Sequence, residues 1–214
     1  MNLLKEYLKT LILSLSAGIC IGIGGTVYLM CESKPLGAIL FAVGLTTILL
    51  FGFNLFTGMV GYLFENKPMY LVKLLIVWIG NFGGTVAVGL VMSLTRVGGR
   101  IAEAARAVTA SKLSDNYLSL FVLGIFCGIL MFVGVDCFKK TWEKKDFASI
   151  FMPVVCVAVF ILSSFEHCIA DMFYFAAAGQ IIEGLPTLLF VTLGNSLGGV
   201  LFALVRRAAT KLSA

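Results

Sequence analysis

Residues Pro35–Phe64 read PLGAILFAVGLTTILLFGFNLFTGMVGYLF, which is 30 residues without one charged side chain. A helix that crosses a bilayer needs about 20 mainly apolar residues. This stretch is therefore long enough to cross, but it is too long for a single straight span. Asn54, Thr57 and Gly58 interrupt its second half. The pattern predicts a membrane-spanning helix that breaks around these three residues.

Five further uncharged stretches of 19 to 22 residues occur along the chain. They are Thr10–Cys31, Leu74–Thr95, Asn116–Val135, Phe147–Phe165 and Gly184–Val205. The whole chain is 60% apolar and 13% charged, whereas soluble domains are about 45–50% apolar and about 25% charged. This composition excludes a water-soluble fold as well as disordered, collagen-like and coiled-coil chains. We expect an all-α membrane protein, with residues 1–214 forming one domain of six transmembrane helices and the first helix retained rather than cleaved.

Basic residues set the expected orientation in the membrane. The N-terminus, the second-to-third and fourth-to-fifth loops and the C-terminus together hold 11 of the 16 Lys and Arg residues. By the positive-inside rule both termini are expected in the cytoplasm. The protein itself is expected in the inner or plasma membrane. Four of the five outer basic residues lie in Arg96–Lys112, which predicts a partly helical, electropositive outer mouth. The other basic residues are expected to face anionic lipid, and no nucleic-acid site is expected.

An internal repeat divides the chain. Three pairs of short segments match at offsets of 106 to 114 residues, and each half contains three expected spans. An odd number of spans places the two halves in opposite orientations, as in inverted-repeat transporters whose substrate path lies on the axis between the repeats. We expect the repeats to cover residues 10–95 and 116–207. The matched segments are Gly18–Gly22 with Gly124–Gly128, Gly52–Thr57 with Ser164–Ile169, and Ile79–Gly84 with Leu193–Gly199.

The fifth span carries three ionisable residues at apparent membrane depth, namely Glu166, His167 and Asp171. Ionisable groups at that depth are costly, and they usually face a cavity or pair with one another. The break in the second span corresponds to this cluster in the other repeat. Paired helix breaks indicate a translocation site, while the alternative is that Glu166 and His167 lie at an interfacial helix end.

These segments resemble the formate/nitrite transporter family over nearly the whole chain. Phe165–Met172, FEHCIADM, is similar to the family pattern F-E-H-S-[IV]-A-N-M, and Leu55–Gly58 matches L-F-T-[GS]. Phe41, Gly44 and Leu45 match the family's F-x-x-G-L stretch. The resemblance implies a homopentamer in which every protomer has its own aquaporin-like pore for small monovalent anions such as formate, nitrite or hydrosulfide.

The resemblance also implies roles for individual residues. His167 matches the histidine at the pore centre, and Thr57 matches the threonine on the loop that breaks the second span. Phe41, Leu45 and Phe160 fall where the family has two apolar constrictions. Lys112 matches the family's lysine before the fourth span, and Glu166 matches its glutamate beside the histidine. With Asp171, Asn54 and Phe56, these residues form the expected substrate pathway. The chain departs from the family at Gly128 and Asp171, where the family has asparagine, and these departures bear on substrate choice.

Two other classes of function are weighed against an anion channel. An intramembrane enzyme could use Glu166, His167 and Asp171 for acid–base chemistry, but the chain lacks a nucleophile motif or a phosphate-binding glycine loop. A neutral-solute channel of the aquaporin kind would carry paired Asn-Pro-Ala loops, which are absent. The single histidine and sparse acids suggest no metal site, and no cofactor is expected. We therefore expect a transport protein rather than an enzyme.

Overall fold

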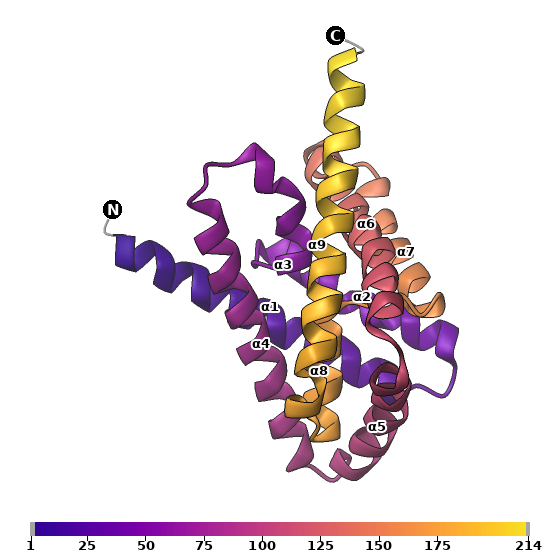
Figure 1. Ribbon diagram of the computed structural model, residues 1–214. Helices are drawn as coiled ribbons and strands as arrows, with labels where there is room; N and C mark the ends of the chain where they lie inside the picture. The colour runs from indigo at the N-terminus through magenta and orange to yellow at the C-terminus, as the bar shows by residue number, and fades with distance from the viewer. Residues whose placement is uncertain (1–2, 213–214) are drawn as a thin grey trace.

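The computed structural model describes residues 3–212, and all regular structure among them is helical. Two short 3-10 helices, η1 (Val60–Glu65) and η2 (Trp142–Lys144), accompany the α-helices. The α-helices are α1 (Leu3–Met30), α2 (Lys34–Phe51), α3 (Phe56–Met59), α4 (Tyr70–Ser93), α5 (Gly98–Ser114), α6 (Tyr117–Thr141), α7 (Ala148–Leu162), α8 (Cys168–Ala178) and α9 (Ile181–Leu212). The helix α5 lies at the end of the molecule opposite the C-terminus (Figure 1).

Helix length and hydropathy agree with a membrane protein. Among the described residues, the five segments α1, α2, α4, α6 and α9 are long and apolar enough to cross a bilayer. The expected fifth span is different, because α7 has 15 residues and α8 has 11, and the chain breaks between them. Neither helix is long enough to cross alone, since a crossing takes about 20 residues. This part of the chain therefore consists of two helical segments in succession.

Both predicted breaks occur, and they begin in the same way. The chain leaves α2 through Gly52, whose φ of 67° lies in the left-handed region, before α3 begins at Phe56. It leaves α7 through Ser164, the residue that the repeat alignment pairs with Gly52, and the φ of Ser164 is 55°. A left-handed residue ends a helix and redirects the chain. The two breaks therefore share a backbone turn at matched positions.

Two asparagine side chains hold the broken segments in place. Asn81 of α4 accepts a hydrogen bond from the amide of Phe56 (2.9 Å) and donates to the carbonyls of Asn54 (2.9 Å) and Ser14 (2.8 Å). Its side chain is fully buried. It thus satisfies an amide and a carbonyl that the helix break leaves without a helical partner.

Asn195 of α9 does the same for the second break. It accepts from the amide of Cys168 (2.9 Å) and donates to the carbonyls of Glu166 (2.7 Å) and Gly124 (2.8 Å). Asn195 is also fully buried. Because irregular backbone at membrane depth needs internal partners, these two residues allow both breaks.

These contacts correct the expected alignment of the first and fourth spans. The asparagine amides bond to Ser14 in one half and to Gly124 in the other, an offset of 110 residues rather than 106. A Cβ at Gly18 would collide with the carbonyl of Asn81, and a Cβ at Gly128 would collide with that of Asn195. The match of Gly18 with Gly124 was therefore wrong by one helical turn. Gly128, where the family has asparagine, lies at the contact between α6 and α9 in this protein.

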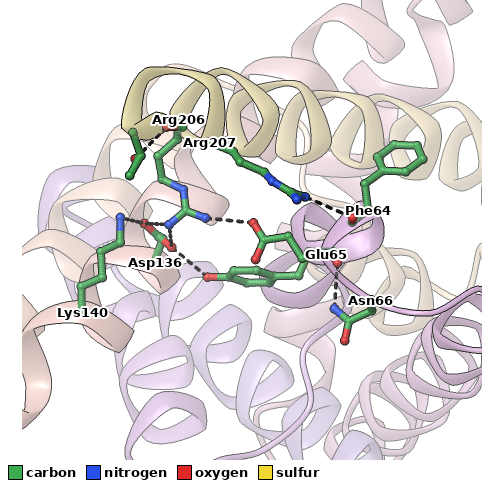
Figure 2. Close-up of polar contacts among 9 residues, drawn as sticks. Phe64, Glu65, Asn66, Asp136, Lys140, Arg206 and Arg207 are labelled. Carbon is green, nitrogen blue, oxygen red and sulfur yellow. Dashed lines mark hydrogen bonds and ion pairs between the residues drawn. The ribbon is translucent and has the colours of Figure 1, made fainter. Parts of the chain in front are cut away.

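A network of charges ties η1 to two long helices near the C-terminal end of the molecule (Figure 2). Arg206 of α9 donates to Asp136 of α6 (3.0 Å) and to Glu65 of η1 (2.9 Å). Lys140 lies 2.9 Å from Asp136, and the hydroxyl of Tyr62 donates to the same carboxylate (3.2 Å). The segment that follows the first break is thus attached to α6 and α9 by these side chains, and the Arg207 side chain also donates to the backbone carbonyl of Phe64 (3.4 Å).

The bonding of Asn195 predicts a specific loss of stability. Replacing Asn195 by Ala leaves the buried Cys168 amide and the Glu166 carbonyl without partners, and each such loss costs about 1–3 kcal/mol. We expect Asn195→Ala to lower the thermal unfolding temperature of the purified protein in detergent. The control is Ser196→Ala, because the Ser196 hydroxyl bonds only to the carbonyl of Thr192 in its own helix. Equal unfolding temperatures for the two variants would contradict this role.

Candidate functional site

His167 and Thr57 meet between the two breaks although 110 residues separate them in sequence. Nε2 of His167 and the hydroxyl oxygen of Thr57 are 2.9 Å apart, and both side chains are almost fully buried. His167 is the N-cap of α8, and its Nδ1 accepts a hydrogen bond from the Ala170 amide (3.0 Å). A neutral imidazole that accepts at Nδ1 carries its proton on Nε2. His167 therefore donates to Thr57, whose own hydroxyl proton is left free to donate elsewhere.

Apolar side chains surround this polar pair. The ring of Phe160 stacks on the imidazole of His167 with centroids 5.3 Å apart, and the ring of Phe41 meets Phe160 edge-on at 6.0 Å. Phe41, Leu45 and Phe160 are all at least 97% buried. The three side chains therefore lie together as an apolar cluster against one hydrogen-bonded pair.

Two cavities border this region. One, which we term the outer cavity, has a volume of about 180 Å³ and is lined by Phe160, His167 and residues near α5. The other, termed the inner cavity, has a volume of about 520 Å³ and lies beside the first break, with Asn54 and Gly58 in its wall. Phe41 and Leu45 line neither cavity. Of the three apolar side chains, Phe160 thus borders the outer cavity, and none of them borders the inner cavity.

The outer cavity contains an ion cluster of three residues, Lys112, Glu166 and Asp171. The ammonium of Lys112 contacts a carboxylate oxygen of Glu166 and lies 2.9 Å from one of Asp171. Their side chains are 10%, 9% and 1% exposed respectively. The sequence prediction grouped Glu166, His167 and Asp171, whereas the structure pairs both carboxylates with Lys112.

The expected electropositive mouth is only partly observed. Residues 98–114 form α5, in agreement with the predicted helical character of this loop, and Arg96, Arg100 and Arg106 are exposed. Lys112, however, is buried between two carboxylates. Burial alone would lower the pKa of Lys112, but the charges of Asp171 and Glu166 outweigh it and hold this pKa above its usual value. Lys112 is therefore a neutralised cation and not a surface charge that attracts anions.

Two predicted pathway residues have other contacts. The side chain of Asn54 donates to the carbonyl of Thr10 in α1 (3.4 Å), although the residue also borders the inner cavity. Phe56 lines an apolar groove between α4 and α9, together with Trp78 and Leu188. Phe56 is thus directed toward the α4–α9 groove, and its amide rather than its side chain belongs to the break.

Several residues at the site were not predicted as site residues. Tyr28 and Tyr174 line the outer cavity, and Lys73 and Lys139 line the inner one. Tyr174 follows Asp171 by three positions, so it lies on the same helix face, and this spacing could have identified it. The two lysines come from the ends of different helices, and no local pattern connects them.

Few hydrogen-bond donors at the centre of the site are left without a partner. The Phe56 and Cys168 amides are bonded to asparagine side chains, so these two helix-start amides are not free donors. Among residues 3–212 no group of three or more His, Cys, Asp or Glu is placed to hold a metal ion. The remaining donor at the centre is the Thr57 hydroxyl, supported by His167.

Known proteins resemble this chain in sequence. The chain is 28% identical over 182 residues to the formate channel FocA of Haemophilus influenzae, covering 74% of this chain and 62% of that protein. It is 29% identical over 182 residues to the nitrite transporter NirC of Salmonella typhimurium, covering 76% and 65%. The chain therefore spans somewhat less than two thirds of the length of these relatives. The match to Escherichia coli FocA, at 26% identity, covers 91% of this chain and 84% of the other.

Solved structures share the fold. A pentameric formate channel with formate bound superposes with a TM-score of 0.81 at 26% identity, covering 99% of this chain and all of that one. An ion channel of the same family gives a TM-score of 0.83 at 26% identity, with 94% and 90% covered. The family described as formate/nitrite transporter matches residues 2–208. With matched breaks around a His–Thr pair and a family match over nearly its whole length, the chain belongs to the formate/nitrite transporter family.

Proposed function

We propose that the protein is a membrane channel for small monovalent anions such as formate, nitrite or hydrosulfide. The observation that carries the proposal is the His167–Thr57 pair, buried against Phe41, Leu45 and Phe160 between two cavities. This pair is the hydrogen-bonding site at the centre of the anion path. Phe41, Leu45 and Phe160 act as its two constrictions.

The proposed topology follows the mirrored contacts of the two asparagines. Residues 1–214 form one transmembrane domain, with inverted repeats over about 10–95 and 116–207. The equivalent bonds of Asn81 and Asn195 support this pseudo-symmetry. Both termini are cytoplasmic, the protein lies in the inner or plasma membrane, and it assembles as a homopentamer like its structural relative.

The chemistry of the site supports small anions as substrates. An anion that leaves water for an apolar constriction loses its hydration, and this loss is costly unless a donor replaces it. The Thr57 oxygen accepts a hydrogen bond from Nε2–H of His167. The Thr57 hydroxyl is therefore free to donate its own hydrogen bond to one oxygen or sulfur of the anion. A small singly charged ion, or its neutral acid, is satisfied by this one donor, whereas a hydrated or doubly charged ion is not.

Flux measurements test this function and its alternatives. Purified protein in liposomes is expected to carry formate, nitrite or hydrosulfide, but neither sulfate nor glycerol. Thr57→Val keeps the side-chain shape and removes the donor to the anion, and a hydrogen bond to a charged group contributes about 1.5–3 kcal/mol. We expect at least about a tenfold loss of anion flux in Thr57→Val and near-normal flux in Thr57→Ser. Flux of glycerol, or no flux of any anion, would contradict the proposal.

The constrictions give a separate prediction about size selectivity. Phe160→Ala removes the ring that stacks on His167, and Phe41→Ala removes its edge-on partner. Both changes widen the path, so larger organic anions such as lactate should enter while formate flux is kept. The matched control is Phe151→Ala, since Phe151 is an exposed residue of α7. If neither Phe41→Ala nor Phe160→Ala changes selectivity relative to this control, the two rings are only packing residues.

A further inference from the structure

The ion cluster of Lys112, Glu166 and Asp171 has one more acid than base. Lys112 contacts both carboxyl groups, and the second oxygen of Asp171, Oδ2, is buried with no hydrogen-bond partner. If both acids were ionised, the cluster would carry a net charge of −1. An unpaired charge in a buried site costs much more free energy than a neutral cluster. One proton shared by the two acids removes that charge.

Within residues 3–212, Lys112 is the one cation that forms an ion pair with Glu166 or Asp171. The groups that face it are Tyr28 of α1, Tyr174 of α8, Cys127 of α6 and the neutral His167. Lys112 is the cation contributed by α5, and its ammonium also lies 6.0 Å from the ring of Tyr174. The ammonium of Lys34 lies 4.8 Å from the centroid of the Tyr28 ring, and neither carboxylate of the cluster is among its ion-pair partners in residues 3–212. The surroundings therefore leave the extra acid uncompensated.

We propose that Asp171 gives the outer cavity a resident proton, and that loss of this proton at high external pH closes the cavity to anions. The inference rests on the proposed function and adds a specificity-determining residue to it. Asp171 stands where the family sequence pattern has asparagine. An asparagine would leave Lys112 and Glu166 as a neutral ion pair with no proton to lose.

The direction of the pH effect follows from the charge. With the proton bound, the outer cavity is neutral and admits an anion as far as His167, which lines the same cavity. Without the proton the cavity carries −1, and this charge repels an anion in the same cavity even at an effective dielectric constant of about 20. Anion entry is therefore favoured at low external pH and falls as external pH rises. Asp171 bonds to His167 through the backbone, its amide donating to the His167 carbonyl (2.9 Å), while its carboxyl group contacts Lys112, so this effect is separate from the imidazole.

The test compares wild type with Asp171→Asn in liposomes, with the internal pH fixed and the external pH varied. The formate flux of each protein is expressed relative to its own value at acid external pH. At alkaline external pH the flux of wild type should fall at least about tenfold below that of Asp171→Asn. Glu103→Gln, which removes an exposed carboxylate from α5, is the matched control and should follow wild type.

Infrared spectroscopy reads the proton without transport. Wild type at neutral pH should show the carbonyl stretch of a protonated carboxylic acid, and Asp171→Asn should lack this band while Glu103→Gln keeps it. Equal flux profiles for wild type and Asp171→Asn, or an unchanged band, would overturn the inference. Absence of flux in both proteins at every pH would overturn the proposed function and, with it, the closing of the outer cavity to anions. The infrared band would still show whether Asp171 adds a proton to the cluster.

Discussion

The bonds from two buried asparagine side chains to broken backbone are the constraint on which this structure depends. A helix break at membrane depth exposes amides and carbonyls that neither lipid nor a continuing helix can satisfy. Asn81 and Asn195 each accept from one such amide and donate to one such carbonyl. Each also bonds to a neighbouring long helix, so the breaks are attached to the helices that surround them. Without these bonds neither break would have a defined conformation.

The breaks in turn create the centre of the site. Because α8 starts in mid-protein, His167 becomes its N-cap and uses Nδ1 to accept from the Ala170 amide. That bond places the ring proton on Nε2 and directs it to Thr57 on the other broken segment. An unbroken helix would use the Ala170 amide internally and leave the imidazole without a fixed tautomer. The backbone interruption thus determines both the position and the hydrogen-bonding role of the histidine.

Charge is distributed differently in the two cavities. In the outer cavity Lys112 is neutralised by two carboxylates, so this entrance has no excess positive charge. The inner cavity contains Lys73 and Lys139, and the ammonium of Lys139 lies 3.8 Å from the Tyr62 ring centroid. The lining of the two cavities therefore differs in charge.

The amino-acid sequence by itself determined the membrane character, the approximate helices and the location of both breaks. These follow from local properties, namely long uncharged stretches and polar residues such as Asn54 and Glu166 within them. Local matching predicted a repeat, but it misaligned the first and fourth spans, because short glycine patterns recur from one helical turn to the next. Only the tertiary structure related Ser14 to Gly124.

The tertiary structure alone decided which polar groups meet. Nothing in the spacing of Lys112, 54 residues before Glu166, shows that it enters the protein rather than facing water. Likewise the matched segments Ile79–Gly84 and Leu193–Gly199 were visible in the sequence, but the hydrogen bonds from their asparagines to the breaks were not. Hydropathy and periodicity describe one helix at a time, whereas burial of an ion or an amide depends on partners from several helices. The physical reason is that a buried polar group is stable only with those partners in place, and the fold supplies them.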